Sequence, residues 1–230
     1  MYNPPPIIPK FQYKNCVQIN DPVTKKRVYR TPDQEHLPSV TTILSATKDM
    51  TSLFKWRKRV GEAVATQITV EASNVGTSMH GNLERFIRQE ERKAGKNTVH
   101  EISHKMADVI IENGLCNVDE IWALEQSLYF PGLYSGTTDL VGVYKGNPAI
   151  MDYKQSNKLK KDEWVEGYRL QIVSYAMAHN EVYGTDIKEG HIFLCTRDLQ
   201  YQQFDVWPSE FEHFQNLWLD TVSRYYEQNK

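Results

Sequence analysis

Two apolar, strand-like runs that each carry an aspartate constrain this chain more than any other feature. Residues 134–144 contain Asp139, and residues 149–153 contain Asp152, with Lys154 two positions further on. Because side chains alternate along a strand, Asp152 and Lys154 are expected on the same face. A hairpin or a bent sheet would bring Asp139 beside Asp152. The sequence therefore predicts a sheet with two carboxylates and a lysine at one point.

The chemistry of these groups suggests a metal site. Two neighbouring carboxylates repel each other unless a cation lies between them. Oxygen ligands of this kind suit Mg²⁺ or Mn²⁺, which keep several waters and bind substrate phosphates. Lys154 beside such an ion can orient or deprotonate an attacking water, which is the outline of a phosphodiester-hydrolysis site. The alternative is structural, with Asp139 capping a turn and Asp152 paired with Lys154 on an edge strand.

Length and composition bound the fold. A chain of 230 residues with 40% hydrophobic and 11% aromatic residues forms one domain with a proper core, or one domain with an appendage. The net charge of −2 provides no global basic field for nucleic acid. Cys16, Cys116 and Cys195 offer neither a disulfide framework nor a CxxC site, which favours an intracellular protein without an iron–sulfur cluster. We see no signal-peptide pattern and no apolar run near the ~20 residues of a membrane helix.

Periodicity and turn residues predict the order of elements. After a proline-rich arm at residues 1–12, two short strands flank a turn at Asn20-Asp21-Pro22. Helices are predicted from Ser39 as N-cap and over 51–69, 73–93, 101–113, 163–183 and 209–227. Strands are predicted over 121–130, 134–144, 149–153, 187–196 and 200–206. This order predicts an α/β (α+β) fold with a mixed central sheet flanked by helices.

Other polar side chains fall where a metal-dependent enzyme could use them. His80 and Glu84 share a helical face, and Glu125 lies in the first strand of the sheet. The alternatives are a His80 satisfied by Glu84 and an outward-facing Glu125. Gln171 and Tyr175 are four residues apart on an apolar helix, where a buried glutamine needs hydrogen-bond partners such as a DNA phosphate or the carboxylates. Their alternatives are a local backbone bond and a place in the core.

The ordered string of these residues resembles the RecB-type branch of the PD-(D/E)XK nuclease superfamily. The string consists of His80, Gly136-x-x-Asp139, Asp152-x-Lys154 and Gln171-x-x-x-Tyr175. Upstream, the chain resembles the mitochondrial genome-maintenance exonuclease family and its phage relatives at Leu37 to Leu44, Trp56 and Gly76-Thr77-x-x-His80. Gln155-Ser156 departs from the Thr-Ser that relatives often carry after the lysine. The RecB-type resemblance spans about residues 73–196, and the second resemblance extends upstream of it.

The resemblance implies a restriction-endonuclease-like core and a Mg²⁺- or Mn²⁺-dependent exonuclease acting on single-stranded DNA in replication, recombination or repair. Residues 73–230 would form this core, and residues 1–72 an N-terminal arm and helical DNA cover. One or two ions would be bound by His80, Asp139, Asp152 and the carbonyl of Tyr153. Lys154 would hold or activate the water, with Gln171 and Tyr175 as positioning groups and Glu84 and Glu125 in the outer shell.

Candidate DNA contacts lie on both sides of the predicted site. Lys158, Lys160 and Lys161 follow the catalytic strand near Trp164, and positive charge with interleaved aromatic residues suits a single strand. A second basic cluster consists of Lys55, Arg57, Lys58 and Arg59 around Trp56. For Trp56 itself, a place in the hydrophobic core is the favoured role. The resemblance adds Ser39, Thr41 and Thr42 as phosphate contacts. Their alternative role is helix capping, which needs Ser39 alone.

Three other functions stay open beside the preferred exonuclease. One is a structure-specific or double-strand-end nuclease of the same superfamily. Another is a catalytically inactive nucleic-acid-binding module, and the last is an α/β binding protein whose acids are structural. We expect a monomer that binds DNA and no membrane, inside a bacterial or phage-infected cell. A single-strand-binding or recombination protein is a further candidate partner.

Overall fold

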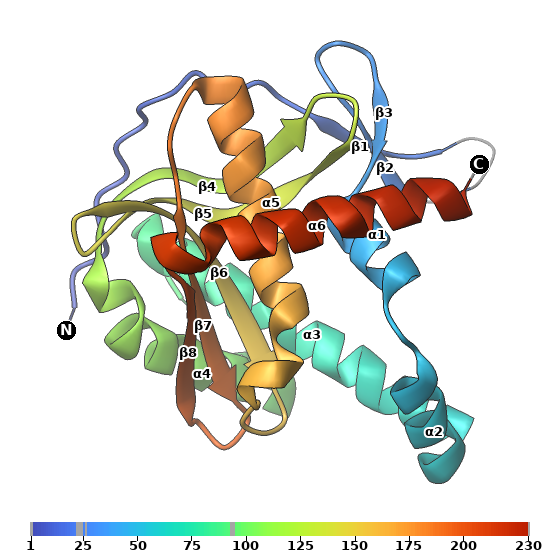
Figure 1. The fold of residues 1–230 in the computed structure, drawn as a ribbon. Helices are drawn as coiled ribbons and strands as arrows, with labels where there is room; N and C mark the ends of the chain where they lie inside the picture. The colour runs from blue at the N-terminus through green and yellow to red at the C-terminus, as the bar shows by residue number, and fades with distance from the viewer. Residues whose placement is uncertain (1, 22–24, 26, 93–94, 230) are drawn as a thin grey trace.

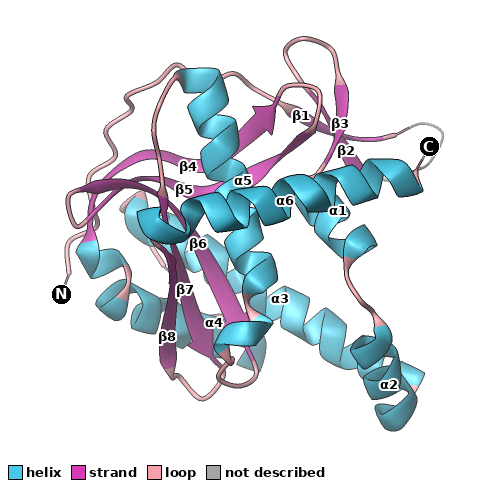
Figure 2. Ribbon diagram, in the orientation of Figure 1, coloured by secondary structure: helices cyan, strands magenta, loops and turns pink. Residues whose placement is uncertain are grey.

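The computed structural model describes residues 2–21, 25, 27–92 and 95–229. Its centre is a five-stranded sheet in the order β4-β5-β6-β7-β8, in which β6 and β7 are parallel and the other neighbours antiparallel (Figures 1 and 2). These strands are β4 (Val118–Phe130), β5 (Tyr134–Tyr144), β6 (Asn147–Ser156), β7 (Glu189–Thr196) and β8 (Tyr201–Val206). The predicted mixed sheet is therefore confirmed.

Helices cover both faces of this sheet. On one face lie α3 (Glu62–Ile87) and α4 (Thr98–Asn113), and on the other lie α1 (Val40–Thr47), α5 (Glu166–Tyr183) and α6 (Pro208–Gln228). The 3₁₀ helices η1 (Leu115–Asn117) and η2 (Asp162–Trp164) are short connectors. Strand β6 shows the alternation, because Met151 and Tyr153 pack towards α3 and α4 whereas Ile150 packs towards α5. In the described parts of the chain, no helix is long and apolar enough to cross a membrane.

The N-terminal region forms a smaller sheet, of β1 (Val17–Asn20), β2 (Arg27–Arg30) and β3 (His36–Pro38). The first two strands pair as predicted, and Pro22 of the predicted turn lies outside the described residues. The prediction missed β3, because three residues are too few for a readable pattern. Ser39 is the N-cap as predicted, since its Oγ accepts a hydrogen bond from Thr42 N at 2.9 Å.

The predicted break between two helices near residue 70 is wrong. The chain turns instead at Gly61, which ends α2 (Thr51–Val60) with a φ of 88°, a conformation that favours glycine. From there α3 continues for 26 residues and passes without interruption through Ser73 and Asn74, which suggested a helix start but are exposed. Helix α2 projects from the body (Figure 1) and contributes no buried residue, so the core role favoured for Trp56 is also wrong.

The N-terminal arm is extended, as its prolines predicted, and packs along β4. Ile8 N donates to Ile121 O at 2.7 Å, and Ile121 N donates to Pro6 O at 2.9 Å. Further along, the Phe11 ring meets Trp122 edge-on, with ring centroids 5.6 Å apart. The arm thereby covers the outer edge of the sheet, which would otherwise expose unpaired backbone groups.

The arm also closes over a buried histidine, which predicts a pH dependence of stability. His179 is fully buried between Tyr13 Oη at 3.1 Å and Thr185 Oγ1 at 2.8 Å, and burial lowers the pKa of His179 to about 4. An unfolded histidine takes up its proton near pH 6.5. Between about pH 6.5 and about 4 the unfolded state therefore binds a proton at His179 that the folded state does not bind. The free energy of unfolding falls progressively as the pH drops through this range.

Urea unfolding at several pH values between about 7 and 4 measures this dependence. We expect His179→Gln to flatten the curve relative to the wild type, whereas the exposed His213, replaced in the same way, leaves it unchanged. Parallel curves for all three proteins would contradict the prediction.

Candidate active site

The candidate site lies where two strands of the sheet separate. Strands β5 and β6 pair from Tyr144 and Asn147 as far as Leu140 and Met151. Beyond that point β5 stays paired with β4, while β6 continues beside β7. A fork opens between them, and Asp139 and Asp152 are the next residues on its two sides. The expected hairpin therefore does bring the two aspartates together.

Asp139 is held from two directions. It is 8% exposed, and its Oδ2 accepts a hydrogen bond from Tyr153 N at 2.7 Å. Its Oδ1 lies 3.5 Å from Nδ1 of His80, which comes from α3, and Nε2 of the same ring lies 3.1 Å from Tyr153 O. The alternative pairing of His80 with Glu84 is not what the described contacts show, because Glu84 binds Arg88 at 3.0 Å.

Asp152 and Lys154 lie on the face of β6 that packs towards α5, as the alternation predicted. The Asp152 side chain is almost fully buried and forms an ion pair with Lys154 Nζ. The same Nζ lies 5.3 Å from the ring centroid of Tyr168, a contact that the sequence analysis did not identify. Tyr153 points to the other face, where its ring packs near Phe193.

Glu125 approaches the same point from β4. Leu124 pairs with Leu140 and Gln126 with Thr138, so Glu125 lies opposite Asp139, with an unusual φ of 51°. One ligand atom each from His80, Glu125 and Asp139 lie within 4.8 Å of one another. The left-handed backbone at Glu125 turns its side chain off the regular alternation of the strand. Nothing in the local sequence signals that conformation.

The crowding of acids perturbs their protonation. Burial raises the pKa of Asp152 to about 6 against the opposing effect of Lys154, and burial and Asp139 raise the pKa of Glu125 to about 7. His80 responds in the opposite sense: burial disfavours its charged form, but the carboxylate of Asp139 outweighs it and raises the pKa of His80 to about 9. The protonated His80 thus supplies positive charge that the carboxylates need, and a divalent cation would supply it instead once His80 gives up its proton.

Gln171 and Tyr175 lie one turn apart on the same face of α5. Tyr175 is buried, and its hydroxyl packs against the backbone of Gly136. A Cβ on residue 136 would lie only 2.8 Å from Tyr175 Oη. The glycine of Gly136-x-x-Asp139 is therefore required by close packing, and the tyrosine supports the strand that carries Asp139.

The hydroxyl groups of α1 are engaged with one another. Ser39 is buried, and its Oγ lies 3.0 Å from Thr41 Oγ1 and 2.7 Å from Thr42 Oγ1. Ser39 also bridges to Ser135, the residue before Gly136. Ser39 is therefore the helix cap, which was the alternative to a phosphate contact. Thr41 and Thr42 are half-buried and lie beside the strand that leads to Asp139.

The three predicted lysines follow β6 directly. Lys158 and Lys161 are exposed, and the backbone N of Lys160 donates to Gln202 Oε1 at 2.7 Å, which ties the segment to β8. Burial and the charge of Lys48 lower the pKa of Lys160. Positive charge therefore gathers where β6 leaves the fork.

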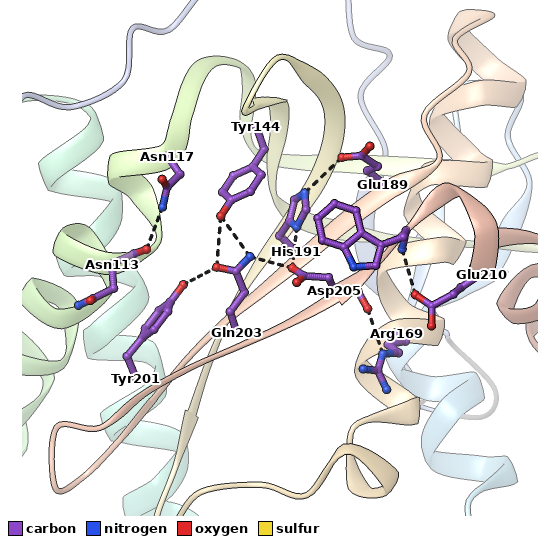
Figure 3. A network of polar contacts seen from close by, with 11 residues as sticks. Asn113, Asn117, Tyr144, Arg169, Glu189, His191, Tyr201, Gln203, Asp205 and Glu210 are labelled. Carbon is purple, nitrogen blue, oxygen red and sulfur yellow. Dashed lines mark hydrogen bonds and ion pairs between the residues drawn. The ribbon is translucent and has the colours of Figure 1, made fainter.

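A second polar network lies on β5, β7 and β8 and involves none of the predicted site residues (Figure 3). Nδ1 of the buried His191 lies 2.8 Å from Asp205 Oδ1, to which Gln203 Nε2 also donates at 2.8 Å. Gln203 in turn bonds Tyr144 Oη at 3.1 Å and Tyr201 Oη at 2.9 Å. These bonds satisfy buried polar groups and fix the edge strand β8 to the sheet.

The chain is similar to an exonuclease of known sequence. No family model matches the chain. Over 175 residues it is 27% identical to mitochondrial genome maintenance exonuclease 1 of mouse (Mus musculus), an alignment that covers 70% of this chain and 50% of the mouse protein. The chain thus spans about half the length of that relative. A solved structure of a candidate exonuclease from Eubacterium rectale is 12% identical, with a TM-score of 0.48 over 70% of this chain and 69% of that one.

Proposed function

We propose that this chain, a homologue of the PD-(D/E)XK exonucleases, is a Mg²⁺- or Mn²⁺-dependent deoxyribonuclease that hydrolyses phosphodiester bonds at the ends of single-stranded DNA. The observation that carries the proposal is the fork between β5 and β6. There Asp139, Asp152 and Lys154 meet His80 from α3 and Glu125 from β4. An α/β protein whose acids were merely structural would not need to bury two aspartates side by side at a point where the sheet opens.

The residues at the fork suit a divalent cation. His80, Glu125 and Asp139 would hold it, with Asp152 and the carbonyl of Tyr153 as further ligands of one or two ions. Such an ion polarises a phosphate and lowers the pKa of a bound water. Glu84 contributes negative charge at longer range, since it helps to raise the pKa of Glu125. Glu84 thus fits the outer shell, whereas Glu125 is near enough for direct ligation.

The remaining groups orient the reactants. Lys154, already held by Asp152 and by the ring of Tyr168, places a positive charge where negative charge develops on the phosphate. Gln171 is half-buried one turn before Tyr175, so its amide would position a carboxylate or a backbone phosphate. Asp139 keeps its orientation through Tyr153 N, and this bond fixes the carboxylate before any substrate arrives.

The DNA strand would approach over lysines and hydroxyls. Lys158, Lys160 and Lys161 would neutralise phosphates beyond the fork, and Thr41 and Thr42, with Ser39 as their cap, would meet the backbone on the side of β5. Within the N-terminal region of residues 1–72, residues 39–69 would contribute the cover over the strand. We place the enzyme as a monomer in a bacterial or phage-infected cell, beside a single-strand-binding or recombination protein.

Digestion of single-stranded oligonucleotides labelled at the 5′ or the 3′ end tests this function. We expect ladders with Mg²⁺ or Mn²⁺, none with EDTA, and no cleavage of circular single strands. Cleavage of circles would favour the endonuclease alternative. Intact DNA with every metal, from a protein that is folded and still binds DNA, would overturn the enzyme in favour of a binding module.

A further inference from the structure

We propose that the hollow beside the end of β6 is a base-binding subsite, in which one nucleobase of the substrate strand stacks on Trp164. The inference rests on the proposed nuclease function and adds a specificity-determining residue to it. The hollow has a volume of about 380 Å³ and is formed by Ala72 of α3, by Gln155 and Ser156 of β6, and by residues 157–160 with Trp164. That volume lies in the range of ordinary ligand sites.

Two large apolar side chains are exposed in this hollow. Trp164 is 58% exposed and Leu159 is 45% exposed, although tryptophan is usually buried for most of its surface. Lys161 Nζ lies 5.4 Å from the Trp164 ring centroid, so a cation already accompanies the indole. An exposed indole beside lysines is the combination that binds single strands, because every base offers a flat face for stacking.

The wall of the hollow offers a hydrogen-bond acceptor. Gln155 Nε2 donates to Ala72 O at 3.1 Å, but Gln155 Oε1 has no hydrogen-bond partner among the described residues. A buried acceptor without a donor is costly, and an amino or imino group at the edge of a base would supply one.

The charge around the hollow fits a nucleotide. Among the described residues that line it there is no carboxylate, whereas Lys158 and Lys160 both line it. Lys160 also lies close enough to Lys48 for the two charges to repel each other, a repulsion that a phosphate between them would relieve. The base would thus stack on the indole while its phosphate meets the lysines.

The hollow lies within reach of the fork. Gln155 follows Lys154 directly and is three residue steps along the strand from Asp152, about 10 Å at ~3.3 Å per step. A stacked strand advances about 3.4 Å per nucleotide, so the stacked base lies roughly two or three nucleotides from the scissile phosphate. A base that is paired in a duplex cannot lie on the indole in this way, and the subsite therefore selects unpaired DNA.

Fluorescence anisotropy in EDTA measures binding of a single-stranded oligonucleotide without cleavage. We expect Trp164→Ala to weaken binding about 5- to 100-fold, the affinity equivalent of one lost base stack, and Trp164→Phe to retain most of it. Trp207 is similarly exposed, at 45%, but lies at the start of α6, so Trp207→Ala is the matched control and should bind as the wild type does. Circular dichroism verifies that each variant is folded.

A scan of single abasic positions gives the decisive result. The wild type should lose affinity at one position near the cleaved end, and Trp164→Ala should lose nothing further there. Equal losses in both proteins, or unchanged binding by Trp164→Ala, would overturn the subsite. Cleavage by the wild type is measured in parallel with Mg²⁺, so failure of the subsite with cleavage intact is distinct from failure of the nuclease function.

Discussion

Replacement of Lys154 by alanine is expected to lower kcat about 10²- to 10³-fold, the usual loss when one preorganised electrostatic group is removed from a reaction centre. The reason is local, because the Lys154 ammonium lies between Asp152 and the Tyr168 ring, at the mouth of the fork. The loss should appear in kcat more than in KM, since a single strand has many other contacts. Single-turnover cleavage of an end-labelled strand measures it.

The metal response of the same variant separates chemistry from binding. Without Lys154, Asp152 loses its partner and the carboxylates repel each other more strongly, so Mg²⁺ should stabilise the variant against heat at least as much as the wild type. Lys145→Ala is the control, because Lys145 lies over the Tyr144 ring at the opposite end of β5. A Lys154→Ala enzyme that cleaves at the wild-type rate would remove the lysine from the mechanism.

Introduction of a side chain at Gly136 is expected to cost about 1–3 kcal/mol of stability, the range for overpacking a well-packed core. In Gly136→Ala the new Cβ would lie 2.8 Å from Tyr175 Oη and 2.9 Å from Tyr175 Cε1, and tyrosine in the middle of α5 has little room to withdraw. Because Asp139 follows on the same strand, cleavage should fall as well. Urea unfolding and strand cleavage measure the two effects.

A matched glycine provides the control for this substitution. Gly167 lies in the first turn of α5, and a Cβ there would meet nothing within 4 Å. Gly167→Ala should leave cleavage unchanged and raise stability by about 0.5–1 kcal/mol, the usual difference between the two residues in a helix. Equal stability of Gly136→Ala and the wild type would show that Tyr175 can move away, and would end the packing explanation of the motif.

The sequence was most informative about the sheet and the residues that follow from its alternation. The strands over 134–144 and 149–153 placed Asp139, Asp152 and Lys154 correctly, because apolar runs with a fixed period of two leave few choices. The predicted resemblance to the mitochondrial genome-maintenance exonucleases is confirmed by the mouse relative, which is 27% identical over 175 residues. Spacing along the chain does not connect His80 with the aspartates, because His80 contacts Tyr153, which is 73 positions away in the sequence. Only the resemblance predicted that His80 belongs to the same site.

Features that depend on one backbone angle or on contacts between distant segments were not predictable. The turn at Gly61 and the position of Glu125 both follow from positive φ values, which a single residue type does not reveal. Polar residues such as Ser73 and Asn74 occur at helix starts and also on exposed helix surfaces. The sequence therefore could not distinguish a new helix at residue 73 from the exposed face of one long helix. Tyr168 lies near Lys154 only because α5 crosses β6.

The unbroken course of α3 has a mechanical consequence. Its 26 residues make a rod of about 39 Å, with the turn to the projecting α2 at one end and His80 near the other. A helix bends little without proline or a bulge, so a push on the projecting end is transmitted as a rigid displacement. His80, whose Nδ1 lies 3.5 Å from Asp139 Oδ1, and the projecting α2 are thus joined by one continuous helix, so a ligand that displaced α2 would also act on the fork.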